Sequence, residues 1–318
     1  MAIILVLLAL ASLALRVGRV PERIALLPDW SGYDRLLFWR LLALRGSIEY
    51  APGVSVKERA TGHSWFMVRC NDAECAPPQA DERVIACLGG STTWGYGVND
   101  AETYPARLES LLNVSGAGRL RYRALNLAFP GTTTYDGVHE FTRVALESGA
   151  SVAVIAYGGV NDSGLAYHQD RRYRTYFPPL RVARSFAWYR FAESLWYRLV
   201  LFPEPVPRVP EPEYVANLKA METAFRARGA TVVFLTERRL PGPEPLFPSR
   251  RSVQQNYRHA MLRLSQEIGT PVVDSEACLD DNSPGAYLAD GTHWSPSGSR
   301  RIAECLAEVV RAFGRGER

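Results

Sequence analysis

The sequence predicts an α/β protein, a three-layer α/β/α sandwich around a five-stranded parallel sheet. Beyond Gly46, short runs rich in Val, Ile and Ala alternate with segments of helical periodicity. Gly149, Gly229 and Gly269 stand where the C-terminal caps of three such helices are expected. Because alternating strands and helices wind into a parallel sheet with a helix layer on each face, this pattern favours the sandwich. The chain has 318 residues, of which 47% are hydrophobic, so it can bury a sizeable core.

The individual elements follow from these runs. Each expected strand is bounded by Gly, Pro or polar residues, and the five strands cover residues 83–88, 122–127, 151–157, 231–236 and 271–274. Helical periodicity fills the intervals, and the five expected helices cover residues 103–113, 134–148, 214–228, 252–268 and 297–313.

Two segments do not fit the alternation. Residues 46–80 contain short β-like pieces and are expected to add a small ribbon before the first core strand. Residues 163–212 are aromatic and rich in Pro and Arg, and we interpret them as an insertion after the third strand. This insertion either forms a lid or lipid-facing surface beside the ligand site, or packs on the flank of the sheet without touching the ligand.

Residues 2–15 form an unbroken run of Ala, Ile, Leu, Val and one Ser, which is typical of a targeting or membrane segment. As a helix the run spans about 21 Å against a hydrocarbon core of about 30 Å. It therefore either extends toward Val20 with Arg16 and Arg19 snorkelling, or is the core of a signal peptide. The arginines after the run would keep the rest of the chain in the cytoplasm, unless a mis-called start codon has removed a basic leader.

An amphipathic helix is expected over residues 36–44, lying at a lipid interface or docked on the folded domain. We therefore divide the chain into an N-terminal anchor or signal region, residues 1–45, and a folded domain, residues 46–318.

Charge and cysteine content exclude several classes of protein. The net charge is +4 and no long basic run occurs, so no nucleic-acid partner is expected. The five cysteines form no CxxC pair, which argues against a structural metal. Cys87 and Cys305 lie in apolar runs and are expected to be buried thiols, whereas Cys70 and Cys75 can pair in an oxidising compartment. The oligomeric state cannot be predicted from the sequence.

The ligand site is expected at the carboxyl ends of the strands, where open parallel sheets bind their ligands. After the first strand comes Gly-Gly-Ser-Thr-Thr at residues 89–93, a strand-to-helix turn that exposes the Ser91 hydroxyl. This serine is either a nucleophile, or part of a helix N-cap or of a phosphate-binding nest.

The next two strand ends supply candidate hydrogen-bond donors. Gly131 follows the second strand and lets a backbone N–H approach a ligand. After the third strand comes Gly-Gly-Val-Asn-Asp at residues 158–162, where Asn161 presents an amide to an oxyanion or serves only as a turn residue.

Asp290 precedes His293 by three residues, directly before the last helix. An Asp at this spacing can orient the imidazole through Nδ1 and leave Nε2 to take a proton from a serine. The rival interpretation is a metal pair, but the sequence has no further His or Cys cluster to complete a coordination shell.

This ordered combination of blocks resembles the SGNH hydrolase superfamily, also called GDSL-type esterases and lipases, whose fold is flavodoxin-like. The resemblance covers about residues 83–313. It departs from the family at Gly90, where an Asp is usual, and this departure weakens assignment to a subfamily. The Gly-Gly-Ser-Thr-Thr form, followed by Glu-Thr-Tyr-Pro at residues 102–105, is similar to the membrane-tethered bacterial members.

The resemblance implies a serine esterase that needs no metal or organic cofactor. Ser91 would be the nucleophile of a triad with Asp290 and His293. The N–H groups of Ser91 and Gly131 and the side chain of Asn161 would form the oxyanion hole.

Residues next to this machinery, Thr92 and Trp294, are expected to bind substrate. The substrate would be a carboxylic ester of a small acyl group, an acetylated saccharide or a lipid. Two alternatives stay open: an O-acyltransferase that uses the same residues on a saccharide, and a non-catalytic ligand-binding module. Because members of this kind mostly act outside the cytoplasm, we expect a membrane anchor with the catalytic domain in the periplasm or extracellular space.

Overall fold

The computed structural model describes Leu10 and residues 47–51, 54–61, 64–69, 71, 78–114, 121–166, 169–171, 187–196, 199–200, 204, 206–240, 250–279 and 285–316. Contacts divide the chain into two compact units. The larger comprises Leu44–Ser163 and Glu211–Arg318, and the smaller includes Gly164–Pro210. Each unit is considered by itself below.

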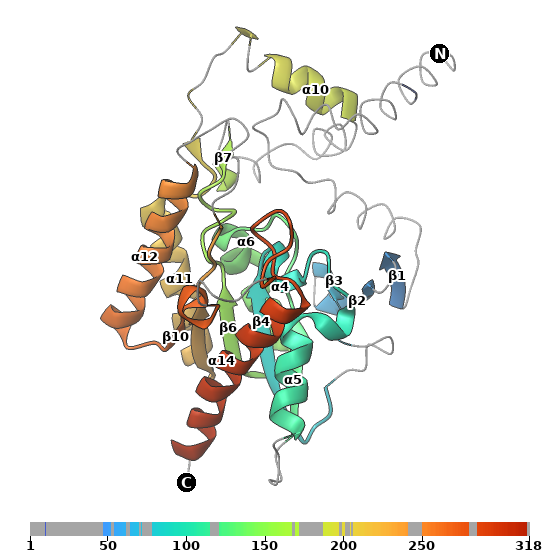
Figure 1. The fold of residues 1–318 in the computed structure, drawn as a ribbon, viewed down its shortest axis with the longest axis vertical. Helices are drawn as coiled ribbons and strands as arrows, with labels where there is room; N and C mark the ends of the chain where they lie inside the picture. The colour runs from blue at the N-terminus through green and yellow to red at the C-terminus, as the bar shows by residue number, and fades with distance from the viewer. Residues whose placement is uncertain are drawn as a thin grey trace. The chain divides into compact units, whose positions relative to one another are not determined.

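The larger unit is built on an eight-stranded sheet with the strand order β1-β2-β3-β5-β4-β6-β9-β10 (Figure 1). Five neighbouring strands run parallel, which confirms the predicted sheet. They are β4 (Glu82–Gly89), β5 (Arg121–Asn126), β6 (Ala150–Ala156), β9 (Thr231–Leu235) and β10 (Val272–Val273). Cys87 of β4 lies opposite Asn126 of β5 and Val154 of β6, so the carboxyl ends of these three strands meet at one edge of the sheet.

The predicted ribbon extends the main sheet. Its strands β1 (Ser47–Ala51), β2 (Val54–Thr61) and β3 (Ser64–Arg69) pair antiparallel with one another. The last residue of β3, Arg69, then pairs with Asn126 at the end of β5. The end of β3 therefore lies beside the carboxyl ends of the strands that carry the candidate site.

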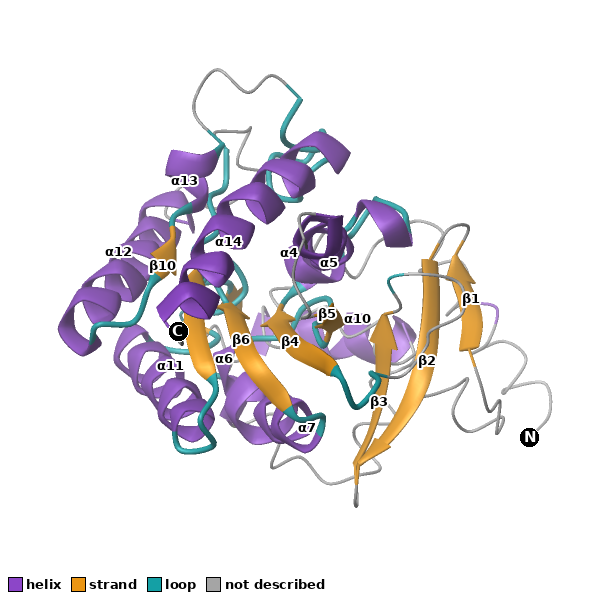
Figure 2. Cartoon of the chain, turned by 90° about the horizontal axis from the view of Figure 1, so that it is seen from below, coloured by secondary structure: helices purple, strands orange, loops and turns teal. Residues whose placement is uncertain are grey.

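Helices cover both faces of the parallel strands, as the sandwich requires (Figure 2). One face is covered by α5 (Tyr104–Val114) and α14 (Pro296–Gly316), which pack against each other. The other face carries α11 (Glu211–Arg226), with α12 (Arg250–Ile268) packed beside it. The predicted helix over residues 134–148 is three consecutive pieces: α6 (Thr134–Asp136), the π-helix η2 (Gly137–Phe141) and α7 (Thr142–Glu147).

The core between the sheet and α14 is apolar and closed to solvent. Ile302, Leu306 and Val310 recur at helical spacing along α14 and are buried. They meet side chains of the central strands such as Ile85 and Val154, both fully buried. Truncating one such side chain to Ala typically costs about 2–5 kcal/mol, so this face fixes α14 and the loop that leads into it.

The prediction for Cys305 as a buried thiol is wrong. Cys305 on α14 forms a disulfide with Cys278 at the end of α13 (Ser275–Cys278), with Cα atoms 6.5 Å apart. Cys305 lies on the side of α14 that faces α13, and the apolar neighbours in sequence do not reveal which side that is. Cys87 is a buried free thiol, as predicted. Cys70 and Cys75 lie outside the described residues.

The smaller unit contains part of the predicted insertion. β7 (Leu165–Ala166) and β8 (Val206–Pro207) pair antiparallel, and beside them the buried Arg208 guanidinium donates to both carboxylate oxygens of Asp170 at 2.9 and 2.8 Å. The helix α10 (Ala187–Trp196) ends in exposed apolar side chains, Leu195 and Trp196. Most of the N-terminal region assigned as an anchor, residues 1–45, lies outside the described residues. Among the residues that are described, no helix is long and apolar enough to cross a membrane.

Candidate active site

Ser91 begins α4 (Ser91–Trp94), the short helix that follows β4 directly. Gly90 precedes it with extended backbone, and Gly95 ends the helix in the left-handed conformation at φ 85°. The Gly95 N–H donates to the carbonyl oxygens of Ser91 and Thr92, which closes the turn tightly. The half-buried Ser91 therefore stands at the carboxyl edge of the sheet.

His293 and Asp290 lie on the loop that leads into α14. The Leu288 N–H donates to the His293 carbonyl at 2.8 Å and fixes the loop. Asp290 Oδ1 accepts from the backbone N–H groups of Thr292 at 2.9 Å and His293 at 3.0 Å. Asp290 Oδ2 lies 2.7 Å from His293 Nδ1, so the carboxylate holds the backbone and the ring of the same histidine.

Electrostatics keep Asp290 ionised. Partial burial raises the pKa of its carboxyl, but hydrogen bonds from the His293 side chain and from two backbone N–H groups outweigh burial and bring the pKa below its usual value. An ionised carboxylate accepts hydrogen bonds only, which fixes the His293 tautomer with its proton on Nδ1.

The imidazole of His293 bridges Asp290 and Ser91. Its Nε2 lies 2.7 Å from Ser91 Oγ, although the two residues are 202 positions apart in the sequence. The ring of Tyr96 packs against the same imidazole, with ring centroids 4.7 Å apart. The structure thus brings together all three residues proposed as a triad, and the arrangement can take a proton from the serine hydroxyl.

The candidate oxyanion donors meet at the ends of three adjacent strands. Asn161, after β6, donates from Nδ2 to the Thr132 carbonyl at 2.9 Å. The Thr132 hydroxyl donates in turn to the Gly89 carbonyl at 3.1 Å, which ties the Gly131 loop to the end of β4. Gly131 has φ 81°, a backbone conformation that favours glycine. Asn161 and Gly131 are therefore held beside the turn that carries Ser91.

Asp162 joins two loops of the candidate site, a role that the sequence analysis did not assign to it. Its buried carboxylate accepts hydrogen bonds from the backbone N–H of Thr134 at 2.9 Å and from the Thr134 hydroxyl. Thr134 begins α6, the helix that follows the Gly131 loop. Asp162 thus ties the turn that carries Asn161 to the loop that carries Gly131, and its position next to Asn161 is the one sequence signal for this role.

Glu237 is a second residue that sequence reasoning missed. It follows β9 and is 6% exposed. Burial raises the pKa of its carboxyl to about 8, because hydrogen bonding with the Thr92 side chain and the Gly158 backbone offsets only part of the desolvation, and Asp162 adds repulsion. A single Glu after a strand carries no sequence signal that separates it from a surface carboxylate.

Two residues predicted to bind substrate are buried. Trp294 is 2% exposed, and its ring packs in the core edge-on to Tyr104 at a centroid distance of 5.8 Å. It pairs with Tyr287 in a β-bridge, and successive side chains of extended backbone point to opposite sides, so Trp294 turns inward where His293 turns outward. Thr92 is also buried, in the second position of α4.

Within the described part of the chain, no group of three or more His, Cys, Asp or Glu side chains is arranged to hold a metal ion.

Comparisons with known proteins agree in family and fold. The sequence model of the GDSL-like lipase/acylhydrolase family matches residues 87–301. The isoamyl acetate-hydrolyzing esterase 1 homolog of Homo sapiens is 29% identical over 124 residues, which cover 33% of this chain and 48% of that protein. The match thus spans about half the length of this curated relative.

Two solved structures are similar in fold. The lipase/acylhydrolase from Enterococcus faecalis has a TM-score of 0.51 and 16% identity, and the match covers 73% of this chain and 96% of that one. LAE5, an alpha/beta hydrolase enzyme from the metagenome of Lake Arreo, Spain, has a TM-score of 0.50 and 18% identity, covering 72% and 95%. At these identities the two structures show the fold alone.

Proposed function

The chain belongs to the GDSL-like lipase/acylhydrolase family, and from this premise we propose that it is an ester-hydrolysing enzyme, a serine esterase with Ser91 as nucleophile. In this proposal His293 is the general base and acid, and Asp290 orients the imidazole. The single observation that carries the proposal is the bridge formed by His293, 2.7 Å from Ser91 Oγ on one side and 2.7 Å from Asp290 on the other.

The reaction proceeds in two halves that share these groups. Ser91 Oγ attacks the ester carbonyl carbon while its proton passes to His293 Nε2, giving a tetrahedral oxyanion. The intermediate collapses, the alcohol leaves with the proton from His293, and the acyl group stays on Ser91. Water then attacks the acyl carbonyl, gives its proton to His293 and releases the acid, and the proton returns to Ser91.

The oxyanion hole is assigned to the backbone N–H groups of Ser91 and Gly131 and to the Asn161 amide. Ser91 is the first residue of α4, and the first N–H groups of a helix have no intrahelical acceptor. Asn161 Nδ2 carries two hydrogens, one of which is donated to Thr132. The second hydrogen is the one proposed to meet the developing negative charge.

The substrate class is a carboxylic ester of a small acyl group, an acetylated saccharide or a lipid. The name of the human relative, an isoamyl acetate-hydrolyzing esterase homolog, makes short aliphatic acetates the first esters to test. Hydrolysis of p-nitrophenyl esters of increasing chain length and of acetylated sugars would be measured for the wild type, Ser91→Ala and His293→Ala. We expect turnover by the wild type and a loss of several orders of magnitude in both variants. Turnover that survives Ser91→Ala would contradict the proposal.

We further propose that the catalytic domain acts outside the cytoplasm, held by the N-terminal segment. The apolar run at residues 2–15 supports an anchor or signal, and the Cys278 to Cys305 disulfide is of a kind that persists in oxidising compartments. A reporter fused after Arg318 should be active on the extracytoplasmic side of the membrane. Reporter activity found solely in the cytoplasm would overturn this location.

A further inference from the structure

Arg69 is a charged side chain buried inside the folded domain. It is the last residue of β3 and is 1% exposed. Taking a guanidinium out of water is costly unless its donors are all matched, so the position demands a compensating set of acceptors. Arg69 also lies before residue 87, where the family match begins. The family match therefore assigns Arg69 no role.

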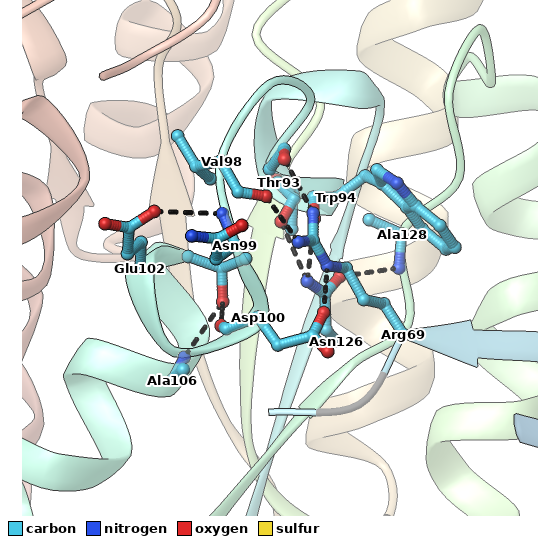
Figure 3. A network of polar contacts seen from close by, with 12 residues as sticks. Arg69, Thr93, Trp94, Val98, Asn99, Asp100, Glu102, Ala106, Asn126 and Ala128 are labelled. Carbon is cyan, nitrogen blue, oxygen red and sulfur yellow. Dashed lines mark hydrogen bonds and ion pairs between the residues drawn. The ribbon is translucent and has the colours of Figure 1, made fainter. Parts of the chain in front are cut away.

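The guanidinium meets four acceptors from one short segment (Figure 3). Nε donates to Asp100 Oδ1 at 2.9 Å, and Nη1 donates to the carbonyls of Trp94 at 2.7 Å and Gly95 at 2.6 Å. Nη2 donates to the Val98 carbonyl at 2.6 Å. Trp94 is the last residue of α4, and the final carbonyls of a helix receive no hydrogen bond from N–H groups of the same helix. Arg69 thus acts as the cap of the nucleophile helix and as the clamp of the turn that follows.

The clamped segment, residues 95–100, contacts both Ser91 and His293 of the candidate triad. The Tyr96 N–H donates to the Ser91 carbonyl at 3.0 Å, and the Tyr96 ring lies on the His293 imidazole. A Cβ on Gly97 would come within 2.5 Å of Leu288 Cδ1, so this segment also packs closely on the loop that holds His293. A shift of the segment would therefore be felt by Ser91 and His293 together.

We propose that Arg69 is a positioning residue for catalysis: by clamping residues 95–100 it holds Tyr96 against His293 and so keeps the imidazole aligned with Ser91. This inference rests on the proposed triad and deepens it. His293 is held on one ring edge by Asp290 and on one face by Tyr96. Tyr96 is 56% exposed, so few neighbouring side chains surround its ring. In this proposal the ring is held in place through its backbone, which Arg69 fixes at Gly95 and Val98 on either side.

The test compares Arg69 with Arg123, a partly buried arginine on β5. Arg69→Met and Arg69→Lys would be measured beside Arg123→Met, which removes the ion pairs of β5 to Glu82 and Glu109. The readouts are kcat and KM for p-nitrophenyl acetate, the rate of Ser91 modification by a fluorophosphonate, and the melting temperature. All kinetics are run well below each melting temperature.

We expect Arg69→Met to lower kcat and the labelling rate by tenfold or more with little change in KM, because a misalignment of about 1 Å costs up to about 10²-fold. Arg69→Lys should lose less, since it keeps one or two of the donors. Arg123→Met should lower the melting temperature while kcat stays within about twofold of wild type. If Arg69→Met and Arg69→Lys merely lose stability as Arg123→Met does, with kcat preserved, the inference is wrong.

A second variant tests the route through Tyr96 should Arg69→Met fail to fold. Tyr96→Ala should reproduce the loss in kcat without a large change in melting temperature, and Tyr96→Phe should restore it because the ring remains. Combined with Arg69→Lys, Tyr96→Ala should add little further loss, since both act on the same contact. A wild-type kcat in Tyr96→Ala would overturn the proposal. So would a double variant whose loss in kcat equals the product of the losses in Tyr96→Ala and Arg69→Lys. Ser91→Ala is assayed in parallel: turnover in that variant would instead refute the proposed triad.

Discussion

The side-chain amide of Asn161 occupies the space that a side chain on Gly90 would need. A Cβ placed on Gly90 would lie 2.5 Å from Asn161 Nδ2. Gly90 has an ordinary extended backbone, so its φ does not require glycine. A side chain on Gly90 would therefore have to displace the Asn161 amide.

This relationship predicts a selective effect of Gly90→Ala. The methyl group meets the far end of a flexible side chain, so folding should tolerate it, with a change in unfolding free energy of about 1 kcal/mol or less. Asn161, however, must move away from its bond to Thr132. We expect kcat to fall by tenfold or more while the melting temperature stays near that of wild type. A variant with normal kcat would show that the amide position is unimportant.

Asn161→Ala tests the same donor directly. If its amide binds the oxyanion, kcat should fall by roughly 10²- to 10³-fold with little effect on folding, because the residue lies in a loop. Combined with Gly90→Ala, the loss should hardly grow, since both changes remove one donor. Unchanged turnover in Asn161→Ala would reduce this residue to a turn former.

The raised pKa of the Glu237 carboxyl predicts how the free energy of unfolding depends on pH. The pKa of its carboxyl is about 8 in the folded protein, against 4.5 for the ordinary group. Between these values the folded state keeps a proton that the unfolded chain has released, so stability falls as pH rises through this range, by at most about 1.4 kcal/mol per pH unit. Glu237→Gln should flatten this fall and unfold at higher urea than wild type at pH 8. Parallel urea midpoints for the two proteins from pH 5 to 8 would contradict the assignment.

The disulfide between Cys278 and Cys305 should stabilise the domain without taking part in catalysis. It closes a loop of 27 residues, for which chain entropy gives about 3–4 kcal/mol. Reduction, or the double change to Ser, should lower the unfolding free energy by about this amount, measured by urea denaturation. Residual activity per folded molecule should be unchanged. Equal stability of the oxidised and reduced proteins would count against a structural role.

How far the sequence could predict this structure depends on the range of the interactions. The strands and helices were predictable because periodicity and glycine caps are local signals. Ser91, Asn161, Asp290 and His293 were identified because each stands at the end of a strand or before a helix, where the topology brings ligands. The order of elements gives their positions, and the resemblance to the SGNH hydrolase superfamily implies their roles.

Other features depend on packing that a sequence does not display. The contact of Arg69 with the nucleophile turn requires the register of β3 beside β5, which joins segments 57 residues apart. The burial of Trp294 could not be predicted, because its position next to His293 in the sequence does not show that successive side chains of extended backbone point to opposite sides. Cys305 was misassigned because its pairing with Cys278 depends on which face of α14 packs against α13, and the sequence does not show that face.

The most direct test of the central claim is to identify the residue that reacts with a fluorophosphonate. The account predicts one covalent adduct, located by mass spectrometry on Ser91, and none in Ser91→Ala. His293→Ala should slow formation of the adduct by at least about 10³-fold, because the serine loses its base. An adduct on another residue, or ester hydrolysis at the wild-type rate in Ser91→Ala, would contradict the account.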